Sequence, residues 1–94
     1  MAKKSPNIDF MMAYVSDFLE GRMKRWEFDI DFDHHIITRF AKMERENPEF
    51  AEAFGYYIST CGVDRGDGLS DAAYKKLIRE QYEELLDVAE GGFL

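Results

Sequence analysis

The sequence predicts an all-α fold, a small four-helix bundle in a single domain. Apolar residues recur at spacings of three and four along most of the chain, which is typical of helices with one buried face. Both prolines directly follow residues that cap helices well. A chain of 94 residues has room for only one core. We therefore expect one domain over 1–94, with its core over 6–89 and short flexible ends at 1–4 and 91–94.

The first helix is predicted over 6–20. Ser5 is a suitable N-cap residue, and Pro6 fits the first helical position because its missing N–H would have no intrahelical acceptor there. Gly21 stands where a left-handed residue would end the helix. The expected apolar stripe consists of Ile8, Met11, Met12, Val15, Phe18 and Leu19.

The segment 26–33 alternates apolar and acidic residues, which by itself is typical of a half-buried strand. No other segment alternates in this way, and a solitary strand would leave its backbone donors and acceptors unpaired. We therefore favour a long helix over roughly 25–46, either continuous or broken near Asp33. Its expected core face is Phe28, Phe32, Ile36, Phe40 and Met43, flanked by Ile37, with Trp26, Ile30 and His34 on an adjoining face.

A third helix is predicted over 48–60. Asn47 is its expected N-cap, and the junction before Pro48 predicts a turn of two or three residues after the second helix. Gly62 is expected to end the helix. Phe54 lies in the middle of its apolar stripe, and we expect this ring to be buried against the first and last helices.

The last helix is predicted over 71–89. Ser70 is the expected N-cap, with Leu69 and Tyr74 spaced as in a hydrophobic staple. The pair Gly91-Gly92 is expected to end the helix.

Charge and composition narrow the classes of function. Twelve basic and nineteen acidic residues give a formal charge of −7, which argues against direct nucleic-acid binding and favours a basic protein partner. No apolar run is long enough to span a membrane and no signal peptide is evident, so we expect a cytoplasmic protein. The single cysteine, Cys61, excludes a disulfide within the chain and a CxxC metal site.

The sequence predicts no metal site, no cofactor and no catalytic residue. In the turn 64–68 the carboxylates do not fit a calcium loop, because placing Gly68 at the sixth position leaves Asp67 as the only ligand. His34 and His35 point about 100° apart on a helix, so they cannot share a site without a third ligand. Cys61 belongs to an apolar stripe and has no evident base.

Two acidic clusters are the strongest local signals. Helical spacing brings Glu27 near Asp31 and gathers the carboxylates of the last helix on one of its sides. Each cluster is either a solvated face that keeps the protein soluble or a docking surface for a basic partner. The candidate partner-binding residues are Glu27, Asp29, Asp31 and Asp33 in the first acidic cluster, and Glu80, Glu83, Glu84 and Asp87 in the second acidic cluster.

Several short stretches resemble the colicin D-type, or bacterial self-protective, immunity proteins. They are the helix end Asp17-Phe18-Leu19-Glu20-Gly21-Arg22, Phe28 at the start of the second helix, Phe54-x-x-Tyr57, and Leu69-Ser70-Asp71 followed by Leu77, Ile78 and Leu85. Members of that family are small helical bundles without enzymatic activity that cover the basic active site of a cognate nuclease toxin with acidic side chains. The resemblance implies the same role here, although it carries over no toxin-contacting residue by position.

Two functions follow from these patterns. The first is an immunity-like, non-enzymatic protein that inhibits a basic bacterial toxin or nuclease through an acidic surface. The alternative is a structural or regulatory interaction domain, such as a subunit of a larger assembly or a mobile-element accessory protein. The fourteen aromatic residues discriminate between them, because a contiguous exposed patch containing Trp26, Tyr56 or Phe93 favours the assembly. An acidic face with few exposed aromatics favours the inhibitor.

Overall fold

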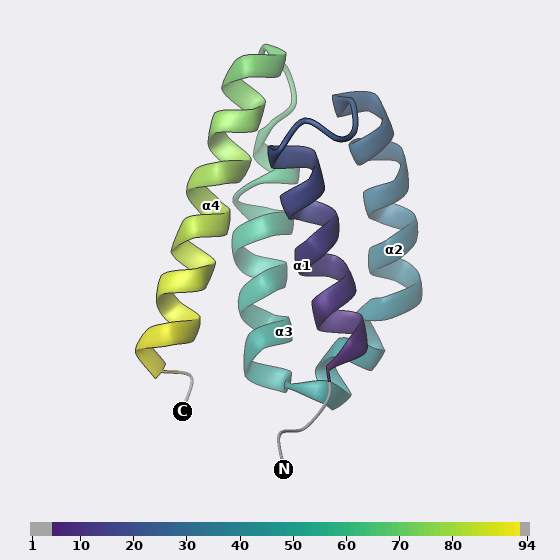
Figure 1. The fold of residues 1–94 in the computed structure, drawn as a ribbon, viewed down its shortest axis with the longest axis vertical. Helices are drawn as coiled ribbons and strands as arrows, with labels where there is room; N and C mark the ends of the chain where they lie inside the picture. Colours follow the sequence, from purple (N-terminus) through teal and green to yellow (C-terminus); the bar gives the residue numbers. More distant parts are fainter. Residues whose placement is uncertain (1–4, 93–94) are drawn as a thin grey trace. The chain divides into compact units, whose positions relative to one another are not determined.

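The computed structural model describes residues 5–92, and within that range the chain forms four α-helices and no strand. The predicted all-α class with four helices is confirmed (Figure 1). The backbone divides into two compact units, residues 1–51 and 52–94, which are described in turn. The segments 1–4 and 93–94, expected to be flexible, lie outside the described residues.

The first unit contains two antiparallel helices, α1 over Pro6–Leu19 and α2 over Arg25–Glu46 (Figure 1). The turn between them begins at Gly21, which has a φ of 84°. The N–H groups of Gly21 and Arg22 donate to the carbonyls of Phe18 and Asp17, at 3.1 and 2.9 Å. This is a Schellman motif, and it confirms the end of the helix predicted at Gly21.

The N-terminus of α1 is capped from the far end of α2. Ser5 occupies the N-cap position and Pro6 begins the helix, as predicted, but the Ser5 side chain makes no capping hydrogen bond. Instead, the backbone N–H groups of Asn7 and Ile8 donate to the Glu46 carboxylate at 2.9–3.1 Å. The Asn7 amide adds a further hydrogen bond to Glu46 at 2.6 Å. A carboxylate suits this position because it satisfies unpaired amide donors and interacts favourably with the helix dipole.

Stacked aromatic rings form the centre of the first unit. The Phe28 ring lies 4.3 Å from Phe18 and 5.2 Å from Tyr14, both nearly parallel to it. The Tyr14 hydroxyl donates to the Phe28 carbonyl at 2.6 Å, so the buried phenol has a partner. The remaining buried residues of this unit are Ile8, Met11, Val15, Leu19, Phe32, Met43 and Ala51.

The alternating segment 26–33 is helical, and α2 is continuous through Asp33. An alternation of period two also contains two series with a spacing of four, because residues i and i+4 share a helix face. One series, Phe28 and Phe32, is buried, and the other, Trp26 and Ile30, is exposed. The same packing leaves Ile37 82% exposed, so the expectation that Ile37 flanks the core is wrong.

A single residue, Asn47, joins α2 to α3 (Pro48–Phe54), which is shorter than the predicted turn. Asn47 is extended, with φ −160° and ψ 98°, because a residue before proline avoids the helical region. Its side chain caps α3 as predicted, accepting the Phe50 N–H at 3.1 Å.

The chain continues from α3 as a π-helical segment, η1, over Gly55–Thr60. Here the Cys61 N–H donates to the Tyr56 carbonyl at 2.9 Å, five residues back. The predicted helix over 48–60 therefore has the right bounds, but its second half is wound more widely than an α-helix. Phe54, the last residue of α3, is fully buried, which confirms its predicted burial, whereas its packing against the first and last helices stays a prediction.

In the second unit η1 runs antiparallel to α4, which spans Asp71–Gly92 (Figure 1). Ser70 caps α4 as predicted, because its hydroxyl accepts the Ala73 N–H at 3.2 Å. The expectation that Gly91-Gly92 ends the helix is wrong, since α4 runs to Gly92. A glycine lowers helix stability by only about 1 kcal/mol relative to alanine and does not by itself stop a helix.

The connection before α4 includes a short 3₁₀ turn, η2, over Val63–Arg65. It ends at Gly66, which is buried against the Tyr74 ring so closely that any Cβ atom there would overlap the ring. The turn continues through Gly68, whose φ of 84° is left-handed. The buried apolar side chains among the described residues of this unit are Phe54, Ile58, Cys61, Tyr74, Ile78 and Leu85.

Candidate protein-binding surface

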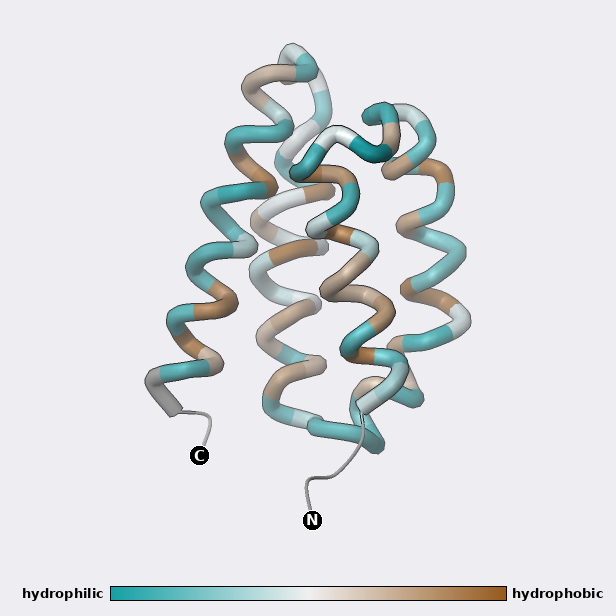
Figure 2. The backbone as a smooth tube through the Cα atoms, viewed as in Figure 1, coloured by the Kyte–Doolittle hydropathy of each residue, from teal (hydrophilic) through white to brown (hydrophobic). Residues whose placement is uncertain are grey.

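The exposed side of α2 carries a row of large apolar residues, which we call the α2 stripe. It consists of Trp26, Ile30 and Ile37, which are 62%, 66% and 82% exposed. Their spacings of four and seven residues place them on one helix face, and exposed Ala41 continues the row toward the C-terminus. Figure 2 shows apolar residues recurring between hydrophilic ones along α2. The helix therefore has apolar residues on its outer face as well as toward the core.

The first acidic cluster lies on both sides of the α2 stripe. Because the segment is helical, Glu27 and Asp31 fall on one side and Asp29 and Asp33 on the other. Glu27 accepts the Lys24 N–H at 3.0 Å, and an Asp29 oxygen lies 3.9 Å from the Arg25 Nε. Asp31 and Asp33 are exposed. The structure therefore does not gather the four residues on one face, but distributes them around an apolar centre.

The C-terminal half of α2 is richer in basic residues. Arg39 and His35 lie toward α1, while Lys42 and Arg45 are exposed. Arg45 falls on the same side of the α2 stripe as Glu27, because the two positions are five helical turns apart. The charge along this helix thus changes from mainly acidic over 27–33 to mixed, with exposed Lys42 and Arg45, toward its C-terminus.

All members of the second acidic cluster are exposed on α4. The spacing of Glu80, Glu84 and Asp87 places them on one side of the helix, with Glu83 beside them. Within residues 5–92, none of these four carboxylates forms an ion pair with a basic side chain. The structure thus places the four side chains together, as the sequence predicts.

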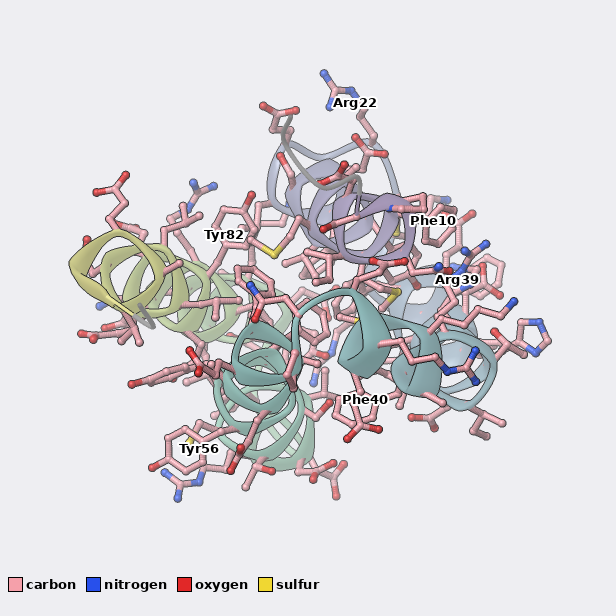
Figure 3. The ribbon with its side chains drawn as sticks, turned by 90° about the horizontal axis from the view of Figure 1, so that it is seen from below. Phe10, Arg22, Arg39, Phe40, Tyr56 and Tyr82 are labelled. Atoms are coloured by element: carbon pink, nitrogen blue, oxygen red, sulfur yellow. The ribbon has the colours of Figure 1, made fainter. Side chains whose placement is uncertain are left out.

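Sequence reasoning missed a cluster of rings and charges between α1 and α2. The His35 ring lies edge-on to Phe10 and Tyr14, with both centroid distances 4.9 Å. The Arg39 guanidinium lies 3.7 Å from the centre of the Phe10 ring and donates to the Asn7 side-chain oxygen at 2.9 Å. Figure 3 shows Phe10 and Arg39 side by side. The sequence does contain a signal for this cluster. Phe10 and Tyr14 are four residues apart on α1, and His35 and Arg39 are four residues apart on α2.

This cluster changes the acid–base properties of its members. Partial burial lowers the pKa of His35, and nearby Arg39 lowers it further, against the opposite effect of Asp31. Burial raises the pKa of the Tyr14 phenol, and the carboxylates of Asp31 and Asp29 raise it further. At neutral pH both His35 and Tyr14 are therefore held in their uncharged forms. His34 is exposed, which agrees with the expectation that only one histidine packs.

A second exposed aromatic residue lies in the π-helical segment of the other unit. Tyr56 is 55% exposed, and its side chain projects outward from the helix (Figure 3). A hydrogen bond with Cys61 raises the pKa of the Tyr56 phenol. Cys61 itself is buried. Phe93, also considered for an exposed patch, lies outside the described residues.

Between residues 5 and 92, no three His, Cys, Asp or Glu side chains lie close enough together to hold a metal ion. In the turn 64–68 the carboxylate residues Asp64 and Asp67 are exposed. No helix in the described part of the chain has both the length and the apolar character needed to cross a bilayer.

Comparisons with known proteins bear on this surface as follows. No protein-family model, characterised protein or solved structure was found to match the chain. The resemblance to the colicin D-type immunity proteins therefore stays a prediction, and the function must be argued from the surface itself.

Proposed function

We propose that the chain is a non-enzymatic protein-binding module whose docking surface is the α2 stripe. The observation that supports this is the exposure of Trp26, Ile30 and Ile37 in one row. Several large apolar side chains exposed on one helix face mark binding sites more often than a single one does, and tryptophan is enriched where interfaces bind most strongly. Of the two functions predicted from the sequence, this favours the interaction domain of an assembly.

The residues around the stripe describe the partner. Asp31 and Asp33 flank its N-terminal part on opposite sides and are exposed. A surface that fits against it is apolar at its centre and carries Lys or Arg where it meets these carboxylates, because such complementarity accelerates association and selects partners. This agrees with the basic protein partner that the net charge predicts.

Photo-crosslinking in cells tests the proposal. A photoreactive phenylalanine analogue replaces Ile37, and in a matched protein it replaces Lys76, which is exposed on α4. We expect discrete protein adducts from position 37 that disappear when Ile30→Glu is added, and none from position 76. Equal labelling from both positions, or adducts that survive Ile30→Glu, would show that the stripe is not a docking surface.

The second acidic cluster supports a second candidate, the toxin inhibitor. Its four carboxylates are exposed together on α4, as a surface that covers a basic site requires. Replacing Glu80, Glu83, Glu84 and Asp87 by Gln and Asn is expected to weaken binding to a captured basic partner and to reduce the salt dependence of binding. Unchanged affinity and salt dependence would leave these residues as a solvated face.

A further inference from the structure

We infer that the partner of the α2 stripe is the α2 stripe of a second copy of this chain, packed antiparallel about a twofold axis near residue 36. This inference rests on the proposed function and identifies the protein that docks. It follows from the order of charges along α2, the position of its small residue, and the exposure of its apolar residues.

The charge order is the first argument. Four carboxylates of α2 fall in the segment 27–33, whereas the segment 40–45 contains the exposed Lys42 and Arg45 with Glu44 as its only acid. A uniformly basic partner would complement the first segment and repel the second. An antiparallel copy places each acidic segment against the basic segment of the other chain, so one surface complements itself.

The apolar residues fit the same register. A twofold axis near residue 36 brings the Ile37 side chains of the two copies close together and places Ile30 next to Ala41 of the second copy. The small Ala41 side chain allows the two helices to approach closely there. Glu27 and Arg45 lie on the same side of the stripe at equal distances from the axis, so each Glu27 faces Arg45 of the other copy. Helix pairs of this kind bury apolar stripes that a single chain leaves in water.

Sedimentation of the whole chain tests this inference. The net charge of −7 on each copy opposes association, so the measurement uses about 0.15 M salt, which screens charges more than about 8 Å apart. A single pair of helices forms a small interface, so we expect a monomer–dimer equilibrium with a Kd in the range of about 1–100 µM. Trp26, the only tryptophan, reports the same equilibrium through a blue shift of its fluorescence as the protein is concentrated.

Charge-reversal variants test the antiparallel register. Glu27→Lys and Arg45→Glu are each expected to weaken self-association at least about tenfold, because each places like charges opposite one another twice per dimer. When the two variants are mixed, both contacts become attractive, so a heterodimer is expected at concentrations where either variant alone is monomeric. Lys76→Glu on α4 is the control and should leave the equilibrium unchanged. Circular dichroism verifies that each variant keeps its helices.

The outcomes separate this inference from the proposed function. If the wild type dimerises but the two variants do not associate when mixed, the antiparallel register is wrong. A wild-type chain that stays monomeric up to about 1 mM overturns the self-association. If crosslinking at residue 37 then gives adducts with a different protein, the docking surface stands and only its occupant is wrong. If crosslinking gives no adduct either, both are wrong.

Discussion

His35 is partly buried between the two helices of the first unit. Phe10 and Tyr14 of α1 contact its ring, while Asp31, His34 and Arg39 of its own helix supply the nearby charges. Only Asp31 favours the imidazolium form, and burial opposes it more strongly. The folded protein therefore binds a proton at His35 less readily than the unfolded chain does.

This difference predicts a loss of stability in mild acid. Because the folded-state pKa lies below the unfolded value of about 6.5, the contribution of His35 is fully present above that pH and is lost as the pH falls below it. Urea unfolding at pH 7.5 and 5.5 measures the change. Between these two pH values we expect the free energy of unfolding to fall less in His35→Phe than in the wild type. The exposed His34→Gln control should lose as much stability as the wild type does. Equal losses in all three proteins would contradict the prediction.

Phe54 is fully buried where α3 continues into the π-helical segment η1. Truncating a buried phenylalanine removes its transfer free energy and leaves a cavity, so Phe54→Ala should lower the free energy of unfolding by about 3–5 kcal/mol. The control is Tyr56→Ala, two residues away and 55% exposed, with an expected change below about 1 kcal/mol. Chemical denaturation of both variants gives the comparison, and similar losses would show that burial does not decide the effect.

Gly66 is required for steric reasons. A methyl group there overlaps the Tyr74 ring, which is itself only 1% exposed and cannot move into solvent without opening the core. Gly66→Ala should therefore cost about 1–3 kcal/mol through overpacking. In the Tyr74→Leu background the ring is absent, so Gly66→Ala should lower stability by less than it does in the wild type. Thermal unfolding of the four proteins completes the cycle, and strict additivity of the two changes would argue against a direct clash.

Among the helices, α2 shows how far the sequence determines the fold. The alternation over 26–33 is compatible with a strand and with a helix, and the absence of another alternating segment decided for the helix. The residues that face the core were predictable in part, because Phe28, Phe32 and Met43 are buried as expected. The spacing groups Ile37 with Trp26 and Ile30, but which of the two apolar faces of α2 is exposed was not predictable, since the packing of α1 selects it.

The cap of α1 was not predictable for a different reason. Ser5 has the right residue type and position, but Glu46 is 41 residues further along the chain. No local pattern relates these segments, and only the antiparallel pairing of α1 with α2 brings the carboxylate to the Asn7 and Ile8 amides. Local signals therefore identify where a helix begins, while the group that satisfies its end depends on tertiary structure.

Removing this cap should destabilise the start of α1. Glu46→Ala leaves the Asn7 and Ile8 amides without their acceptor, at an expected cost of about 1–2 kcal/mol. Hydrogen exchange of these two amides should accelerate more than exchange in the middle of α1. The exposed Glu44→Ala on the same helix is the control and should change neither quantity. Unaltered exchange in Glu46→Ala would show that solvent replaces the carboxylate without loss.

For the molecule as a whole, the order of charged and apolar residues along α2 describes a partner more closely than the net charge of −7 does. The sequence identified the two acidic clusters but not their surroundings. The first acidic cluster lies on both sides of the α2 stripe, whereas the second acidic cluster lies on an exposed side of α4. Exposure depends on which helix faces pack together, so the candidate site could be located from the sequence only in part.

The whole chain is expected not to respond to divalent metals. The turn 64–68 lacks the ligand register of a calcium loop, and His35 points toward rings rather than toward His34 and a third ligand. Added calcium or zinc should therefore leave the melting temperature unchanged. A saturable, stoichiometric rise of several degrees would reveal a metal site and contradict this expectation.

The carboxylate of Glu46 also has a consequence for folding during synthesis. A ribosome translates residue 19, the last of α1, well before residue 46, so the helix emerges with its first amides still hydrogen-bonded to water. α1 can reach its native state only after the whole of α2 has left the exit tunnel. Nascent chains arrested before and after residue 46 emerges should therefore differ sharply in the protease resistance of their first twenty residues.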